Sequence, residues 1–471
     1  MMALQARFWW LLGIVWLAGC SSLPTIVPDL ARQSSASVRL EGSRGVLSAA
    51  QSKAILDRLK SRSPGTDIFE RHLALEEEIV GSPLTTGNAV QLLQDGPATY
   101  RAMFAAIEAA KDHINLETYI LEDDEVGQRF AEALIAKQQQ GVQVNIIRDS
   151  VGTLGTPAAF FKALTDAGIN VLEFNPVNPL LARKTWALNQ RDHRKLLIVD
   201  GSVAFLGGIN ISSVYSGGSF SHDSRGRTKN DSGTGPKGTD PQLAWRDTDL
   251  QLQGPVVAEF QKLFLATWEK QKGPPLAARN FFPPPKSPGR QVVRAIGSSP
   301  SDPFSLIYAT LMSAIGSAET SIYLTNAYFA PDPQLLAALE AAAGRGVDVK
   351  LILPSQTDSW LVFHAGRGYY AQLLRAGVKI YERRGVILHS KTALIDGVWA
   401  TVGSTNLDWR SFLHNDELNA VVLGTEFGSQ VKAMFDKDLA ASDPITLEQW
   451  QQRPLDLRIK EVFGRVWEYW L

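Results

Sequence analysis

The pattern His-x-Lys-x-x-x-x-Asp occurs twice in the chain, at residues 193–200 and again at residues 389–396. The chain holds only 7 histidines among its 471 residues. Even when every basic and acidic residue counts as a match, its composition predicts fewer than about 0.1 such octapeptides by chance. The duplication therefore indicates one site that is built twice, and any fold proposed for this chain has to contain two equivalent units.

Each octapeptide is typical of a β-strand with two functional groups on one face. Side chains two residues apart on a strand point the same way, so His193 converges with Lys195, and His389 with Lys391. The residues that follow each lysine are aliphatic or β-branched, as expected for a strand. A single strand histidine is most simply a core or surface residue. Two copies with the same companions favour a functional site instead.

Each octapeptide ends in aspartate followed by glycine, the dipeptide preferred by two-residue hairpin turns. Asp200 and Asp396 have the opposite parity to the histidines on their strands. We therefore interpret both first as turn or hydrogen-bonding residues, and only secondarily as catalytic groups.

Two-residue hairpins would bring a second set of residues to each site. Cross-strand pairing would place Gly208 opposite His193 and Ser404 opposite His389, with Asn210 and Asn406 two residues further along the same face. A carboxylate that could orient each histidine and fix its tautomer lies downstream of each motif. These two carboxylates are Asp247 and Glu417.

The segments around the motifs repeat in the same order, which predicts a duplicated α/β domain. In each half the patterns predict helix, strand, helix, strand, helix and strand ahead of the motif hairpin. A proline-rich stretch that can continue neither helix nor strand separates the halves. The expected organisation begins with a tether and cap at residues 21–85, with one helix from Ser48 to Lys60. The two domains are expected at residues 86–272 and 291–471, with the linker between them at residues 273–290.

The first half alone carries an insertion at residues 217–242, rich in Gly, Ser, Asp, Arg and Lys. It falls between the motif hairpin and Asp247, so it is expected near the site. It could act as a lid or gating loop, but its composition favours a solvated loop without fixed structure. Aromatic residues are frequent over residues 462–471, which could lie in a lipid interface or dock onto the domain.

The N-terminal sequence predicts that the protein is located in the cell envelope. An apolar run at residues 8–16 is too short to span a bilayer and is typical of a signal sequence. Residues 17–20, Leu-Ala-Gly-Cys, resemble a bacterial lipobox, so we expect residues 1–20 to be a lipoprotein signal segment and Cys20 to be lipidated. An uncleaved anchor is the alternative. The residue after the cysteine is Ser21 and not an aspartate, which resembles an outer-membrane sorting signal. The expected location is therefore the periplasm-facing inner leaflet of the outer membrane, in preference to the inner membrane.

Composition narrows the class of partner. The hydrophobic content of 45% supports a substantial core, and 47 basic against 48 acidic residues give a net charge of −1. No global basic field exists to draw the protein onto nucleic acid, so nucleic-acid partners are not expected. Cys20 is the only cysteine, which excludes an intrachain disulfide.

The paired motifs, each followed by Gly-Gly or Gly-Ser and then Asn, resemble the signature of the phospholipase D superfamily. Within it, segments such as residues 114–120, 245–248, 327–332 and 401–411 resemble bacterial cardiolipin synthases. The resemblance implies two phospholipase D-like domains, each a mixed β-sheet flanked by helices, with one active site at their pseudo-twofold interface. It implies phospholipid substrates and no metal or other cofactor.

The resemblance also implies roles for the motif residues. His193 would attack a phosphodiester phosphorus to give a phosphatidyl-histidine, and His389 would act as acid and then base, although the two roles could be exchanged. Two lysines and two asparagines would bind the non-bridging oxygens: Lys195, Lys391, Asn210 and Asn406. Transfer to a lipid hydroxyl is expected, with hydrolysis by a phospholipase D as the alternative. A nuclease and an inactive membrane scaffold are less favoured, and the sequence leaves the oligomeric state open.

Overall fold

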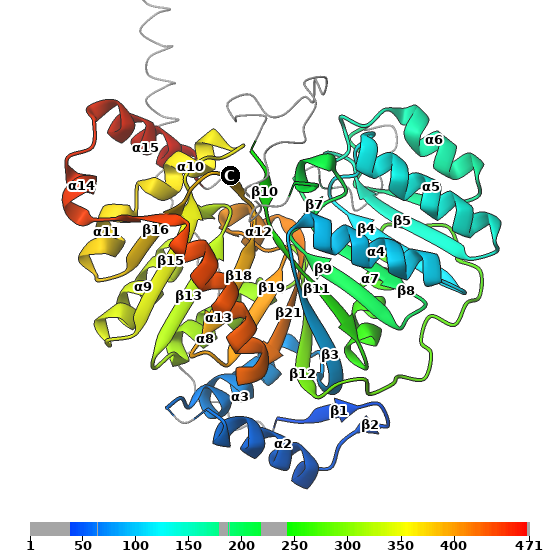
Figure 1. Cartoon of the computed structure of the whole chain (residues 1–471), viewed down its shortest axis with the longest axis horizontal. Helices are drawn as coiled ribbons and strands as arrows, with labels where there is room; N and C mark the ends of the chain where they lie inside the picture. The colour runs from blue at the N-terminus through cyan, green and yellow to red at the C-terminus, as the bar shows by residue number, and fades with distance from the viewer. Residues whose placement is uncertain (1–37, 64, 179–186, 188, 218–242, 469–471) are drawn as a thin grey trace, which may run out of the picture.

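The computed structural model describes residues 38–63, 65–178, 187, 189–217 and 243–468. The expected signal segment with Cys20 lies outside these residues, and so does the insertion beyond Gly217. The two halves of the chain lie side by side, and residues 38–80 pack beneath both of them (Figure 1).

Each half contains one mixed sheet, and the strand order is the same in both. In the first half it runs β3 (Leu84–Gln94), β11 (Thr248–Gln253), β9 (Val203–Gly207), β8 (Lys195–Val199), β4 (His113–Thr118), β5 (Gln143–Asp149), β6 (Asn170–Phe174). In the second half it runs β12 (Gln291–Ser298), β21 (Asn415–Leu423), β19 (Trp399–Gly403), β18 (Lys391–Ile395), β13 (Ser321–Asn326), β15 (Asp348–Pro354), β16 (Lys379–Arg383). The duplicated α/β domain expected from the sequence is confirmed.

The two sheets are joined and share a core. Antiparallel pairing of β3 with β12 connects them at the edge. Inward-facing residues of both sheets form one hydrophobic cluster, so Leu206 and Leu250 of the first half share a core with Val402 and Ala420 of the second. The helices α7 (Val256–Lys270) and α13 (Thr425–Ala440) pack against this shared core. The two halves are therefore fixed relative to each other by buried apolar surface.

The outer face of each sheet is covered by the helices that connect its parallel strands, as parallel pairing requires. In the first half these are α4 (Gly96–Ala109), α5 (Glu125–Gln139) and α6 (Ala158–Asp166), and in the second α8 (Leu306–Ser317), α9 (Pro333–Gly344) and α11 (Tyr370–Arg375). Local signals start them where expected: the Asp124 side chain accepts from the Gly127 N–H at α5, and Asp332 caps α9 directly before Pro333.

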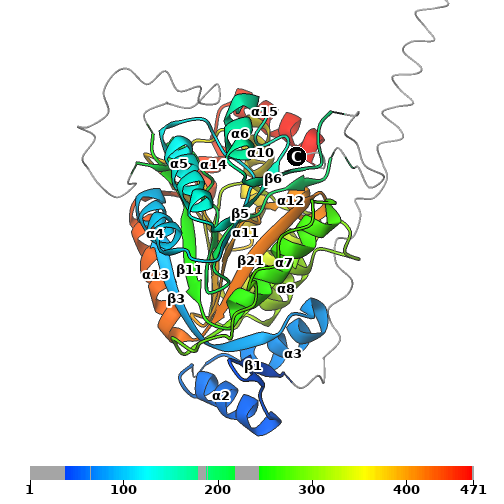
Figure 2. The same cartoon turned by 90° about the vertical axis from the view of Figure 1, so that its right-hand side faces the viewer.

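Figures 1 and 2 both show the N-terminal cap at one end of the molecule. In Figure 1 the opposite end holds β7 (Arg191–Asp192), which directly precedes His193, and β10 (Trp245–Arg246). A short hairpin, β1 (Leu40–Gly42) and β2 (Gly45–Val46), extends the sheet by pairing β1 with β3. The expected helix is present as α2 (Ala49–Ser61), begun by a capping box at Ser48. A second helix, α3 (Ile68–Val80), was not predicted.

Several C-terminal elements of the second half have no counterpart in the first. They are α10 (Trp360–Arg367), β22 (Ser442–Ile445), α14 (Leu447–Gln451) and α15 (Leu455–Trp467). Between Lys270 and Gln291, where the sequence predicts the linker, the chain forms neither helix nor strand. Among the residues that the structure describes, none of the helices combines the length and apolar character needed to cross a bilayer.

The motif hairpins are one residue longer than predicted. Asp200 and Gly201 both have positive φ, and Ser202 N–H donates to the Val199 carbonyl, as in a type I′ turn. The ladder then pairs Val199 with Val203, so Ser202 is an additional loop residue. The second hairpin repeats this, pairing Ile395 with Trp399. The predicted placement of Gly208 and Ser404 directly opposite the histidines is therefore wrong.

Candidate active site

Two short parallel pairings bring the motif histidines to one edge of the molecule. The strand β7 (Arg191–Asp192), just before His193, pairs with the start of β21 from the second half. The strand β17 (Ile387–Leu388), just before His389, pairs with β10 (Trp245–Arg246) from the first half. Each histidine also donates its backbone N–H to the other half, His193 to the Asp416 carbonyl at 2.9 Å and His389 to the Arg246 carbonyl at 2.8 Å.

These pairings cross the two candidate carboxylates between the halves. Nδ1 of His193 lies 3.0 and 3.1 Å from the two carboxylate oxygens of Glu417, and Nδ1 of His389 lies 2.7 Å from Oδ2 of Asp247. The expectation that a carboxylate downstream of each motif orients that motif's own histidine is therefore wrong in its pairing. Glu417 directly follows Asp416, whose carbonyl accepts from the His193 N–H, and Asp247 directly follows Arg246, whose carbonyl accepts from the His389 N–H. The main-chain pairing between the halves therefore brings each carboxylate to the histidine of the other half.

A carboxylate at Nδ1 fixes which ring nitrogen is available for chemistry. With Nδ1–H donating to the acid, Nε2 of each imidazole is the free basic nitrogen. Burial, reinforced by Lys195 and Lys391, holds the pKa of His193 well below its usual value. Burial and Lys391 also lower the pKa of His389, but Asp247 opposes them. His193 is thus the more firmly neutral of the two histidines.

The two motif lysines are buried beside the histidines, as predicted, although each histidine lies just before the strand that begins at its lysine and not within it. Lys195 Nζ donates to the His193 carbonyl at 2.6 Å, and Lys391 Nζ donates to the His389 carbonyl. Burial lowers the pKa of Lys195 to about 7 and that of Lys391 to about 8. Buried ammonium groups of this kind are poorly solvated and favour an anionic ligand.

The positions expected opposite the histidines instead contact the acids of their own halves. The Ser404 hydroxyl donates to Glu417, whose pKa burial raises to about 7 although Lys195 opposes the shift. A Cβ added at Gly208 would lie 2.3 Å from Oδ1 of Asp247, so glycine is needed there to admit the carboxylate. Ser404 therefore supplies a hydrogen bond to the acid of its half, whereas Gly208, at the equivalent position, leaves space for the acid of its half.

The two asparagines differ in their engagement. Asn210 accepts from the Ile120 N–H at 3.1 Å and donates to the Tyr215 hydroxyl at 3.1 Å, so both ends of its amide have partners. The buried Oδ1 of Asn406 has no partner among the described residues. Asn406 is therefore the asparagine with hydrogen-bonding capacity left for a ligand.

Asp200 and Asp396 lie at the turns rather than with the histidines. Asp200 accepts from three consecutive backbone N–H groups, at residues 111–113, and Asp396 accepts from those at residues 319–321. Both have positive φ, which aspartate tolerates better than most residues. They anchor the start of the neighbouring strand in each half.

Aromatic side chains that were not assigned a role from the sequence surround the histidines. The Tyr119 ring packs edge-on against His193 at 5.2 Å, and Lys195 Nζ lies 5.4 Å from the same ring. His389 has three aromatic neighbours at 5.2 to 5.9 Å: Trp245, Tyr215, Tyr328. Tyr119 and Tyr328 lie in segments that resemble cardiolipin synthases, which was the only signal available.

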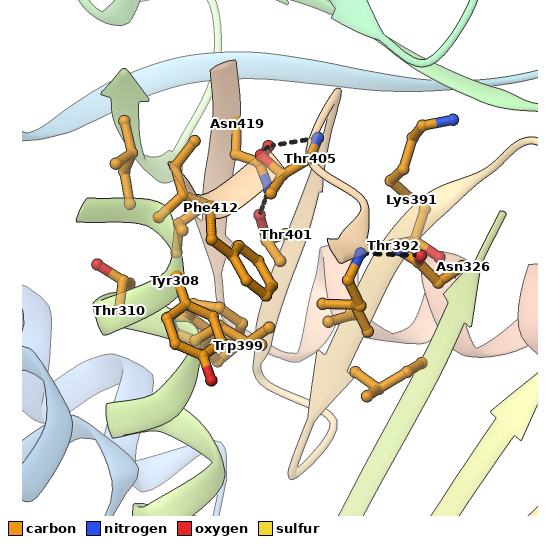
Figure 3. Close-up of a pocket in the computed structure, with 17 residues that line it drawn as sticks. Tyr308, Thr310, Asn326, Lys391, Thr392, Trp399, Thr401, Thr405, Phe412 and Asn419 are labelled. Atoms are coloured by element: carbon orange, nitrogen blue, oxygen red, sulfur yellow. Dashed lines mark hydrogen bonds between the residues drawn. The ribbon is translucent and has the colours of Figure 1, made fainter. Parts of the chain in front are cut away.

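A cavity of about 30 Å³ lies below Lys391 in the second half, enough for one or two water molecules (Figure 3). Its wall combines the rings of Tyr308, Trp399 and Phe412 with several polar groups, among them Thr401, Thr405 and Asn419. In the matching hairpin of the first half, Phe205 and Ile209 occupy the positions of Thr401 and Thr405. Both belong to the hydrophobic cluster between the first sheet and the helices α4, α5 and α6. Within the described ranges, no group of three or more His, Cys, Asp or Glu residues is arranged so that it could hold a metal ion.

Comparisons with known proteins agree with this duplicated site. A family model described as "Cardiolipin synthase, PLD-like domain" matches residues 103–217 and again residues 311–439. The cardiolipin synthase of Geobacillus sp. (strain WCH70) is 36% identical over 398 residues, covering 84% of this chain and 74% of that protein. The cardiolipin synthase of Halalkalibacterium halodurans is 33% identical over 392 residues, covering 82% and 73%.

A solved structure supports the fold independently of sequence. The phosphatidylserine synthase of Haemophilus influenzae Rd KW20 superposes with a TM-score of 0.60 at 13% identity, covering 84% of this chain and 99% of that one. At this identity the likeness establishes the fold alone. With a family match on each motif and relatives aligned over most of their length, the chain belongs to the phospholipase D superfamily, in the cardiolipin synthase family of duplicated phospholipase D-like domains.

Proposed function

We propose that the protein is a phosphatidyltransferase that makes cardiolipin, moving the phosphatidyl group of one glycerophospholipid onto a hydroxyl of another. Membership of the cardiolipin synthase family supports this assignment. The observation that carries it is the crossed pair of histidine and carboxylate, His193 with Glu417 and His389 with Asp247. One neutral nucleophile and one separate acid–base group are what a two-step transfer needs.

In the first step, Nε2 of His193 attacks the phosphorus of the donor lipid and forms a phosphorus–nitrogen bond. The bond from phosphorus to the headgroup oxygen breaks, and His389 gives its proton to the departing alcohol. The low pKa of His193 keeps its lone pair available at neutral pH. Burial and Lys391 lower the pKa of His389, but Asp247 opposes them and so favours the protonated form that the leaving group requires.

In the second step, neutral His389 removes the proton from the acceptor hydroxyl as its oxygen attacks the phosphorus. The phosphorus–nitrogen bond breaks, which restores His193 and leaves His389 protonated for the next cycle. Lys195 and Lys391 stabilise the negative charge on the non-bridging oxygens in both steps. Asn406 can assist by donating from its amide nitrogen Nδ2, because its unpaired Oδ1 can only accept.

We further propose that the protein acts at the bacterial envelope, anchored through lipidated Cys20 and facing the periplasm from the outer membrane. The support is the lipobox-like sequence and the serine that follows it. Mass spectrometry of the N-terminal peptide tests the anchor, because lipidated Cys20 would be its first residue.

The transfer reaction is tested with vesicles of labelled phosphatidylglycerol, the purified mature protein and no added metal, with products resolved by mass spectrometry. Cardiolipin and glycerol are the expected products. Phosphatidic acid without cardiolipin would contradict transfer and identify water as the acceptor, which is the reaction of a phospholipase D.

A further inference from the structure

Large apolar side chains are exposed along one side of α15. Six residues of this helix are 47% to 71% exposed: Leu455, Ile459, Val462, Phe463, Val466, Trp467. Their spacing places all of them on one helical face, which we call the apolar face of α15. We propose that this face docks the protein on a phospholipid surface and presents the active site to lipids within it. This inference rests on the proposed function.

The apolar face is not the face by which α15 folds onto the protein. The opposite side packs closely on α10, where a Cβ added at Gly464 would lie 2.6 Å from the Ala365 backbone nitrogen. Glu468 accepts from the Tyr369 hydroxyl at 2.7 and 2.8 Å, and the Arg465 guanidinium lies over the Tyr369 ring. The helix is thus held in place, while none of the residues that the structure describes buries its apolar side.

The charges of α15 suit an anionic interface. Arg458 and Arg465 border the apolar face on one side, from their positions around the helix. On the other side Lys460 is paired with the exposed Asp456 at 3.2 Å. The buried Glu461 is paired with Arg453 and lies on the packed side. Apolar residues that face outward beside basic side chains characterise helices that lie in the plane of a lipid interface. This charge pattern favours anionic phospholipids over a second copy of the chain.

The apolar face lies close to the His389 side of the active site. The helix α10, on which α15 packs, rests against β14 (Phe329–Ala330). That strand directly follows Tyr328, whose ring contacts His389. Tyr328 also donates to Asp358, just ahead of α10, at 2.6 Å. Figure 1 shows α10 and α15 at the same edge of the molecule as β7 and β10, the short strands that pair beside the motif histidines.

Exposed apolar residues also flank the His193 side. Val151 and Leu154 follow β5 and are 40% and 72% exposed, and Val177 follows β6 and is 38% exposed. The loop that carries the first two packs on Tyr119, the aromatic neighbour of His193. Apolar contacts on both sides of the site would hold its opening toward the membrane, where the substrate headgroups lie.

The test replaces exposed residues only, so the fold is retained. All proteins are the mature chain, residues 20–471, carrying Cys20→Ser, so that neither the apolar signal segment nor the lipid anchor is present. The test variant combines Ile459→Asn, Val462→Asn and Val466→Asn, and the matched control combines Val46→Asn and Phe282→Asn, exposed apolar residues away from the site. Binding is measured by flotation with vesicles of equal parts phosphatidylglycerol and phosphatidylcholine. Turnover is measured on the same vesicles and on dispersed dihexanoyl phosphatidylglycerol.

We expect the α15 variant to lose about tenfold or more in vesicle binding and vesicle turnover, while the control variant and turnover of the dispersed lipid are unchanged. Unchanged vesicle binding in the α15 variant would overturn the proposal. A parent that sediments as a dimer and an α15 variant that sediments as a monomer would overturn it in favour of a second copy as the occupant. If the parent fails to turn over either lipid, the proposed function is wrong, and flotation alone still decides whether the face binds lipid.

Discussion

The two motif histidines occupy unequal environments although their octapeptides are alike. His193 is paired with a glutamate that also accepts from Ser404, and within the described part of the chain it has a single aromatic neighbour. His389 is paired with an aspartate that glycine admits, and three aromatic rings surround it. The duplication supplied two equivalent frames, and the side chains around each frame have diverged.

This divergence fits the separate tasks that we propose for the two histidines. The pKa of His193 is held well below the usual value by burial and two lysines, so this ring is neutral and nucleophilic. The carboxylate at His389 partly offsets the same effects, so this ring holds a proton more readily. The sequence left the two roles exchangeable, whereas these environments favour His193 as the nucleophile.

Replacing either histidine is the strongest test of this assignment. His193→Gln and His389→Gln should each reduce transfer by at least about 10⁴-fold, because each removes an obligatory group. Only His389→Gln should still form a covalent adduct, slowly, with a phosphodiester whose leaving group needs no proton, such as a 4-nitrophenyl ester. Intact-protein mass spectrometry would detect the adduct.

An adduct on His193→Gln, with none on His389→Gln, would reverse the two roles. Circular dichroism of both variants serves as the folding control. A variant with full turnover would contradict the mechanism altogether.

Replacing the carboxylates tests the crossed pairing. Glu417→Gln and Asp247→Asn should each lower kcat by about 10²- to 10⁴-fold, because the amide no longer fixes the histidine tautomer. Glu417→Gln should slow adduct formation through His193, although the two residues belong to different halves. Asp247→Asn should slow release of poor leaving groups through His389. Single-turnover kinetics measures the two steps separately. If each substitution instead slows the step that depends on the histidine of its own half, the crossed pairing is wrong.

The lysines predict the pH dependence of the free protein. Phosphate binding needs both ammonium groups, and their pKa values of about 7 and about 8 mean that protons are lost as the pH rises. We therefore expect kcat/KM to fall above about pH 7, by up to about tenfold per pH unit. Lys195→Arg keeps the charge and should move this alkaline limb to higher pH. An unmoved limb in Lys195→Arg and Lys391→Arg would assign it to another group.

The repeat explains how much of this site was accessible from the sequence. Strand periodicity predicted correctly that histidine and lysine lie on the same side, where His193 and Lys195 meet one aromatic ring, although each histidine precedes its strand. The predicted elements occur in the predicted order in both halves, but α10 was not predicted. The crossed carboxylates were missed because they depend on parallel pairing between β7 and β21 and between β10 and β17, strands two residues long that carry no periodicity. The register was missed because the loop residue Ser202 does not alter the Asp-Gly signal.

The unpredicted α3 has a different cause. Its buried face includes His72 and Glu76, and the latter pairs with the buried Arg294 at 3.1 Å. Charged residues on a buried face break the apolar pattern by which a helix is recognised. Tertiary ion pairing, invisible in the local sequence, restores the helix.

The smallest expected difference separates the two turn aspartates. Asp396 accepts from three backbone N–H groups, as Asp200 does, but also from the hydroxyl groups of Thr320 and of Thr66 in the N-terminal cap. Asp396→Ala should therefore lower the free energy of unfolding by about 1 kcal/mol more than Asp200→Ala. The strain of alanine at positive φ is common to both sites, at 51° and 52°, and cancels in the comparison.

A double-mutant cycle in urea between Thr66→Val and Asp396→Ala isolates the contact with the cap. A coupling of about 1 kcal/mol is expected, because each substitution alone removes the same hydrogen bond and the second then costs less. The bond that Thr66 also makes to the Ile68 N–H is lost in both backgrounds and does not enter the coupling. Equal destabilisation at Asp200 and Asp396 with no coupling to Thr66 would mean that the cap contributes nothing to the turn of the second half. The two turns would then be equivalent in energy as well as in sequence.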